Sequence, residues 1–141
     1  MAGTGPRRAL LCAGAASAFV AVAAGAFGAH ALRETLPPDR LQVFETAARY
    51  QMYHALALVG LAGIAASSNG GGAASSSSDV ALRRIRTVGA LFVLGTILFS
   101  GSLYALALSG VRVLGAITPF GGACWLTAWL ILVVAAMRGD S

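Results

Sequence analysis

The chain has 141 residues, of which 57% are hydrophobic and only 11% are charged, and its formal net charge is +5. A soluble domain has about 45–50% apolar and about 25% charged residues, so this composition argues against a water-soluble fold. All of the basic residues are arginines, and they cluster at the edges of apolar stretches. That placement indicates lipid headgroups rather than nucleic acid as the partner.

Three uncharged stretches, residues 9–29, 87–111 and 113–137, are each long enough to cross a bilayer as a helix. A shorter apolar stretch follows Arg49, and with residues 50–54 included it reaches the lower limit for a span. The sequence therefore predicts an all-α fold, an integral membrane four-helix bundle. We expect one membrane domain over residues 1–141, with spans at about 9–29, 50–66, 87–108 and 119–137.

The first apolar stretch has an alternative interpretation as a signal peptide. Arg7 and Arg8 would be its basic region, and Ala29-His30-Ala31 has the form of a cleavage site. The uncharged stretch is longer than a usual signal-peptide core, and further spans follow it. We therefore expect a membrane span here.

Residues 30–50 are more polar, and Pro37-Pro38-Asp39 is typical of a break followed by a helix start. Apolar side chains then recur at helical spacing, with polar ones on the opposite face. The sequence predicts an interfacial amphipathic helix over residues 39–49, between spans 1 and 2, that runs into the second span. Its apolar face consists of Leu41, Phe44, Ala48 and Met52, and its polar face of Gln42, Glu45 and Arg49.

Residues 67–79 form a serine- and glycine-rich stretch, which predicts a flexible linker. Thr118-Pro119 predicts the start of the last helix. Six arginines flank the side that holds both chain ends and four flank the other side, which favours cytoplasmic termini. We expect a multi-pass protein of the cell inner (plasma) membrane, or of the mitochondrial inner membrane if the source is eukaryotic.

Two groups of polar side chains stand out within or beside the spans. The first is a candidate ligand or packing cluster near the end of the first span and the start of the second: His30, Glu45, Tyr50, Gln51 and His54. The two histidines could hold haem iron or a metal, or simply hydrogen-bond at the interface. The second group consists of candidate interhelical polar contacts: Ser100, Ser102, Tyr104 and Thr118.

Small residues at four-residue spacing predict close helix packing in the first span, at Gly14 and Ala18 and again at Ala24 and Gly28. The spans contain no Asp, Glu, Lys or Arg well inside them, which argues against an ion-coupled transporter. No nucleophile has a base at sensible spacing. We therefore expect no enzyme, no catalytic residue, no metal site and no cofactor.

Four phrases occur in a fixed order: Gly25-Ala26-Phe27-Gly28-Ala29-His30, Tyr50-Gln51-Met52-Tyr53-His54-Ala55-Leu56, Leu98-Phe99-Ser100-Gly101-Ser102-Leu103-Tyr104 and Thr118-Pro119-Phe120-Gly121-Gly122. In this order and spacing the chain resembles the YgdD-like family of small four-span membrane proteins, a domain of unknown function related to the eukaryotic transmembrane protein 256 family. The resemblance implies an inner-membrane protein and supplies no functional residues.

Three hypotheses follow for the function. The first is a non-catalytic structural or accessory membrane component whose partners are the lipid bilayer and either a second copy or another membrane subunit. The second is a small-molecule, lipid or quinone binder that uses the region of His30 and His54. The third is a bis-histidine haem or metal redox protein.

Overall fold

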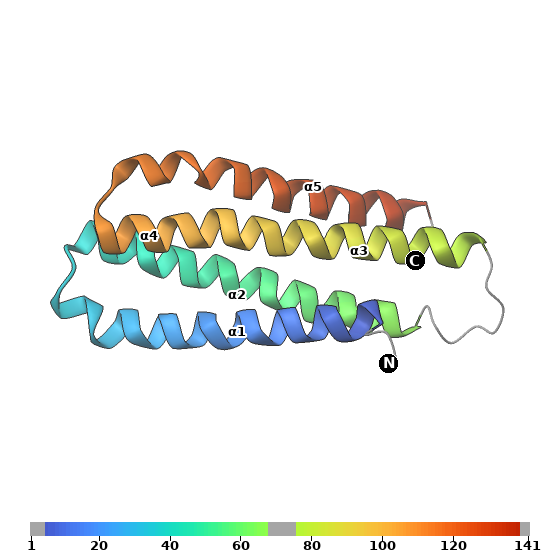
Figure 1. Ribbon diagram of the computed structural model, residues 1–141, viewed down its shortest axis with the longest axis horizontal. Helices are drawn as coiled ribbons and strands as arrows, with labels where there is room; N and C mark the ends of the chain where they lie inside the picture. The colour runs from blue at the N-terminus through green and yellow to red at the C-terminus, as the bar shows by residue number, and fades with distance from the viewer. Residues whose placement is uncertain (1–4, 68–75, 139–141) are drawn as a thin grey trace.

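The computed structural model describes residues 5–67 and 76–138, and within these ranges the regular elements are all helical. The described helices form rods that lie side by side (Figure 1). In chain order the elements are α1 (Pro6–His30), η1 (Leu32–Glu34), α2 (Pro38–Ser67), α3 (Ser76–Thr96), η2 (Ile97–Gly101), α4 (Ser102–Ser109), η3 (Arg112–Ala116) and α5 (Thr118–Met137). The predicted all-α bundle is confirmed.

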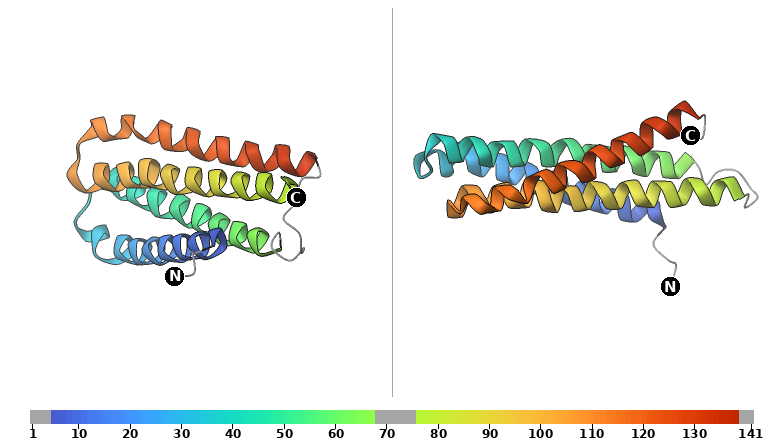
Figure 2. Two further views of the ribbon diagram at one scale, coloured as in Figure 1. Left: turned by 45° about the vertical axis from the view of Figure 1, so that its right-hand side comes forward. Right: turned by 90° about the horizontal axis from the view of Figure 1, so that it is seen from above.

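The rods alternate in direction, so α1 begins and α5 ends at the same end of the bundle (Figure 1). The short 3₁₀ segments η1 and η3 connect the rods at the opposite end. The third rod is α3, η2 and α4 in one line, and η2 is a π-helical turn within it. The main packing pairs are α1 with α2 and α3 with α5, and α2 also contacts α3 and α4 (Figure 2).

Helix α2 includes the helix expected over residues 39–49, which runs into the second apolar stretch as predicted. These residues are the first three turns of a continuous helix that starts at Pro38. Phe44, Ala47 and Ala48 are buried there. The apolar stripe of this segment continues in phase into the second apolar stretch, so one unbroken helix turns the stripe towards the bundle.

Three helical segments are long and apolar enough to cross a membrane: Pro6–Glu34, Asp79–Ser109 and Arg112–Met137. Helix α2 is not among them. Its second half is uncharged but begins with the polar side chains of Tyr50, Gln51, Tyr53 and His54. The linker expected at residues 67–79 lies partly outside the described residues. Of that stretch, Ser67 ends α2 and Ser76 begins α3.

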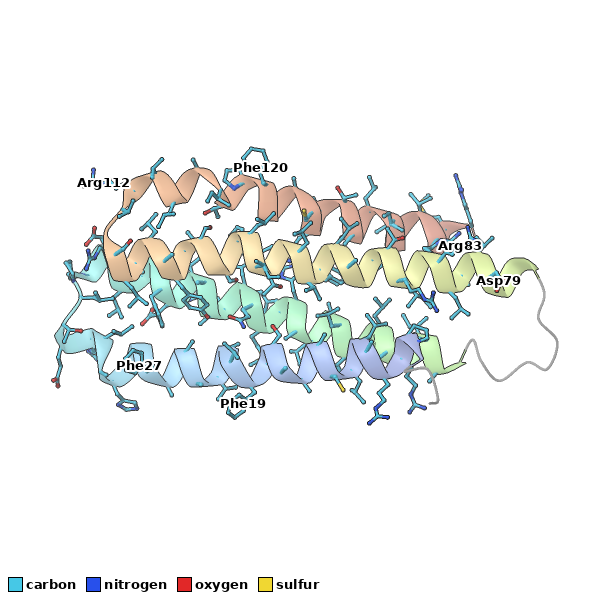
Figure 3. The ribbon with its side chains drawn as sticks, in the orientation of Figure 1. Phe19, Phe27, Asp79, Arg83, Arg112 and Phe120 are labelled. Atoms are coloured by element: carbon cyan, nitrogen blue, oxygen red, sulfur yellow. The ribbon has the colours of Figure 1, made fainter. Side chains whose placement is uncertain are left out.

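Two apolar clusters fill the bundle. The larger one lies towards the end where α1 begins and contains Leu10, Leu58, Leu61, Ala62, Ala65, Ile85, Val88, Phe92, Trp125 and Ala128. The smaller one lies towards the end with η1 and contains Leu32, Phe44 and Ala107. The outer surface is apolar as well: Phe19 and Phe120 are 76% and 68% exposed and point away from the bundle on opposite sides (Figure 3). Apolar side chains thus lie both inside the bundle and on its outer surface, as in a protein that is surrounded by lipid.

Candidate functional site

Four polar side chains are buried in the described part of the chain, and we call them the polar layer: Gln51, His54, Ser100 and Ser102. They come from α2 and from the η2–α4 part of the third rod. A buried polar group is costly in a bundle surrounded by lipid unless it is hydrogen-bonded. Their partners therefore show what this part of the molecule can do.

Gln51 connects three helices. Its Nε2 donates to the carbonyl oxygen of Ser17 in α1 at 3.2 Å, and its Oε1 accepts from the hydroxyl of Tyr104 in α4 at 2.9 Å. An amide is suited to this position because it offers a donor and an acceptor on one planar group. Gln51 thus positions α2 against α1 and α4 simultaneously.

Ser100 lies in the π-helical turn η2 and is 1% exposed. Its hydroxyl donates to the carbonyl oxygen of Ala47 in α2 at 2.9 Å. A π-helical turn changes the direction of the side chains that follow it, and such turns are frequent at functional sites. Here the chemical result is a hydrogen bond between a side chain and the backbone of a neighbouring helix.

Ser102 and Thr118 bring the third rod and α5 together near the end with η3. Their hydroxyl oxygens are 2.9 Å apart, and the Ser102 hydroxyl donates to the carbonyl oxygen of Phe99 at 3.0 Å. The ring of Tyr104 packs against Phe44 with the ring centroids 4.8 Å apart. All four predicted interhelical polar side chains therefore make hydrogen bonds between helices in the structure.

His54 lies between the helix backbone and two tryptophans. Its Nδ1 is 2.8 Å from the carbonyl oxygen of Tyr50, and its Nε2 is 3.4 Å from the indole nitrogen of Trp129. A carbonyl can only accept and an indole N–H can only donate, so Nδ1 carries the proton and Nε2 accepts. The imidazole is thereby held in one tautomer with both nitrogens engaged.

The ring of His54 is stacked on Trp125, with the centroids 3.7 Å apart and the planes 6° apart. Trp125 is 4% exposed and donates its indole N–H to the carbonyl oxygen of Phe92 at 3.2 Å. A Cβ on Gly95 would collide with the indole ring, so this glycine makes the room that the tryptophan occupies. The histidine is thus part of an aromatic stack that joins α2, α3 and α5.

The predicted ligand cluster does not come together as one site. Gln51 and His54 are buried, Tyr50 is 41% exposed, and His30 and Glu45 are exposed. Tyr50 does lie beside the stack, with its ring centroid 6.0 Å from that of Trp125. The cluster is therefore divided between the inside of the bundle and its surface.

The two histidines lie at different levels of the bundle. Gly28 packs on Phe44, which places His30 beside the first turns of α2. His54 is ten residues after Phe44, about 15 Å farther along the helix axis. Within the described residues no three His, Cys, Asp or Glu side chains are grouped so that they could hold a metal ion. The geometry does not support the bis-histidine hypothesis, nor a small-molecule site formed by both histidines.

The sequence alone did not predict the aromatic partners of His54, which are Trp125 and Trp129. It also did not predict that Gly95 and Gly121 allow Trp125 to lie there. The sequence did contain a clue, because a tryptophan inside an uncharged span needs an acceptor for its N–H. A Cβ on Gly121 would meet the backbone nitrogen of Phe99 and, at 2.8 Å, the carbonyl oxygen of Gly95. This close approach of α5 to the third rod is what brings Trp125 onto His54.

The buried polar atoms of the polar layer are hydrogen-bonded to protein atoms from other helices or from their own helix. Two buried side-chain atoms elsewhere lack a partner in the described residues, Ser17 Oγ and Arg40 Nε. The hydrogen bonds of the polar layer thus hold the helices in register.

Comparison with known proteins gives a consistent family. The chain is 41% identical over 125 residues to the UPF0382 membrane protein YwdK of Bacillus subtilis, which covers 89% of this chain and 93% of the relative. It is 38% identical over 136 residues to the UPF0382 inner membrane protein YgdD of Escherichia coli, with 93% and 91% covered. No solved structure matches.

The family described as a protein of unknown function, DUF423, matches residues 24–122, a range that includes the polar layer and Gly121. The relatives are named membrane proteins, in agreement with the apolar helices described above. This chain belongs to the DUF423 family of membrane proteins, to which the resemblance in its four sequence phrases pointed.

Proposed function

We propose that this protein is a non-catalytic structural or accessory component of the inner membrane, with four crossings and both termini in the cytoplasm. The observation that carries the proposal is the polar layer. Its side chains hydrogen-bond across helices, as Gln51 does with Ser17 and Tyr104, and so serve to hold the bundle together. An ion-coupled transporter depends instead on ionisable groups held at depth. The one ionisable member of the polar layer, His54, has both ring nitrogens engaged in contacts within the bundle.

The four crossings are supported by the packing. Helices α1, α3 with α4, and α5 lie in segments that can each span a bilayer. Helix α2 runs antiparallel to α1 and packs along it, with Gly14 against Ala55 and Gly28 against Phe44. A helix packed in this way crosses with its neighbour, although it is not itself among the candidate spans. Cytoplasmic termini follow from the larger number of arginines at the end where α1 begins.

An accessory role also needs a surface for partners. The outward face of α5 carries Leu126 and Leu130, which are 73% and 62% exposed, and that of α1 carries Phe19. Lipid covers such a face, and so does another transmembrane helix. The small residues Gly14 and Gly28 of α1 are used inside the chain against α2, so partners are expected on the large apolar side chains.

Crosslinking followed by native gel electrophoresis tests the accessory role, on protein extracted in mild detergent from its own host. We expect a discrete homo-oligomer or a complex with another membrane subunit. A strict monomer that crosslinks to nothing would overturn the proposal. The topology is tested separately with C-terminal fusions, because green fluorescent protein fluoresces in the cytoplasm and alkaline phosphatase is active only outside it.

A further inference from the structure

A groove of about 390 Å³ opens between α1 and α3, near the end of the bundle where α1 begins. It is lined on the α1 side by Ala9, Leu10 and Ala13, and on the α3 side by Gly89, Ala90, Val93, Leu94 and Ile97. The two helices meet where Leu10 contacts Gly89, whereas their main packing partners are α2 and α5. The volume falls within the range of about 300–1,000 Å³ that is typical of ligand pockets. All side chains that line the groove are apolar.

Arginines continue the α3 wall of the groove towards the end of the bundle. Residues 83, 86, 90, 93 and 97 follow one another at alternating spacings of three and four, so they lie on one helix face. Ala90, Val93 and Ile97 line the groove, and Arg83 and Arg86 are exposed one to two turns before it.

The other wall is basic at the same end. Arg7 and Arg8 directly precede Ala9 and are exposed. Figure 3 places Arg83 and the acidic Asp79 at the outer end of α3. Asp79 is four residues before Arg83 and can pair with it, whereas Arg86 has no acidic residue three or four positions away. Arg86 is thus the arginine best placed to meet an anion at the mouth of the groove.

We propose that this groove binds one acyl chain of an anionic phospholipid, with its phosphate held at Arg86 and the neighbouring arginines. An acyl chain runs parallel to membrane-spanning helices, as this groove does, and basic residues at the cytoplasmic end of a pocket between spans select anionic headgroups. Both walls belong to candidate spans. The inference rests on the proposed transmembrane placement of α1 and α3 and is independent of the accessory role.

Native mass spectrometry of the full chain in mild detergent tests this, with phosphatidylglycerol and phosphatidylcholine of identical acyl chains added in turn. We expect preferential retention of phosphatidylglycerol. Arg86→Gln should lower the affinity for phosphatidylglycerol about fivefold and leave phosphatidylcholine unchanged. Its control is Arg138→Gln, which removes an exposed arginine from the end of α5, away from the groove.

A second pair of variants tests the groove itself. Ala90→Trp fills it from an exposed position on α3, and Ala123→Trp adds the same side chain at an exposed position on α5. We expect only Ala90→Trp to reduce retention of both lipids. Equal retention of the two lipids by the unmodified protein, or equal effects of each variant and its control, would mean non-specific lipid only and would overturn the proposal. If the proposed transmembrane placement of the helices were wrong, the C-terminal fusion reporters described above would show it, and lipid retention would not be the test of it.

Discussion

The two main helix pairs of this bundle use glycine for different purposes. Between α1 and α2, Gly14 allows two helix backbones to approach, since a Cβ there would lie 2.9 Å from the carbonyl oxygen of Ala55. Between the third rod and α5, Gly95 makes room for the indole of Trp125, and Gly121 lies directly on the π-helical turn. The helices of the first pair lie close together because both present small side chains at the contact. The second is close because small residues surround one large side chain.

This difference explains where the hydrogen bonds are. The α1–α2 contact is bridged by Gln51, which reaches the backbone at Ser17. The contact of the third rod with α5 has its own bonds, from Trp125 to Phe92 and between Ser102 and Thr118. Helices in lipid gain little from apolar burial against one another, so close packing and such bonds decide which pairs form.

The largest effect is expected at the aromatic stack. Trp125→Ala removes a buried indole that stacks on His54 and donates to the carbonyl oxygen of Phe92, and we expect it to lower the free energy of unfolding by about 3–5 kcal/mol. Trp129→Ala is the matched control, because Trp129 is 45% exposed and should cost clearly less. Both losses are measured by titrating the protein in mild detergent with sodium dodecyl sulfate. Helix content is monitored by far-ultraviolet circular dichroism, a signal that does not depend on the tryptophans. Equal losses of stability in the two variants would mean that burial of the Trp125 indole does not stabilise the packing of α5.

A smaller loss is expected when the third rod and α5 are forced apart. In Gly121→Ala the new Cβ would meet backbone atoms of Phe99 and Gly95, which cannot turn away as a side chain can. We expect a destabilisation of about 1–3 kcal/mol, the usual cost of overpacking. The same titration gives the value. A variant as stable as the parent chain would show that α5 can shift along the rod without loss.

The corresponding change in the other pair should cost less. In Gly14→Ala the Cβ would lie 2.9 Å from Ala55 O, 2.9 Å from Val59 Cγ2 and 3.0 Å from Val59 N. Val59 Cγ2 can move, and neither backbone contact is as short as the one between a Cβ on Gly121 and the backbone nitrogen of Phe99. We expect a loss of about 1–2 kcal/mol. Gly60→Ala is the control, because a Cβ there meets nothing within 4 Å and alanine favours the helix. If Gly14→Ala were neutral like its control, the α1–α2 contact would be looser than described.

The smallest effect is expected for the polar bridge. Gln51→Leu removes the hydrogen bonds to Ser17 and Tyr104 while keeping most of the side-chain volume, and we expect a loss of about 1 kcal/mol, since interhelical bonds in membranes are individually weak. Tyr104→Phe should reproduce part of that loss. Unfolding titrations of the two single variants and the double variant measure the coupling. Strict additivity would mean that Gln51 and Tyr104 do not share a hydrogen bond.

Some side chains of the site could be named from the sequence and others could not. Ser100, Ser102, Tyr104 and Thr118 stand out because polar groups in an apolar span need partners, whichever partners these are. His30 and His54 are alike in sequence, being at the ends of adjacent apolar stretches. Only one of them is buried, because the register of α1 on α2 places His54 deep in the bundle.

The amino-acid sequence by itself determines that this protein is a helical bundle in a membrane, because the spacing of charge and the length of the apolar stretches follow from the demands of lipid as a solvent. It also determines which polar residues must find partners there. Only the tertiary structure decides that residues 39–49 pack their apolar face on the bundle, where Phe44 is buried, and that His54 stacks on Trp125. Those outcomes depend on the register between helices and on how closely their backbones approach, which residues far apart in the chain decide together.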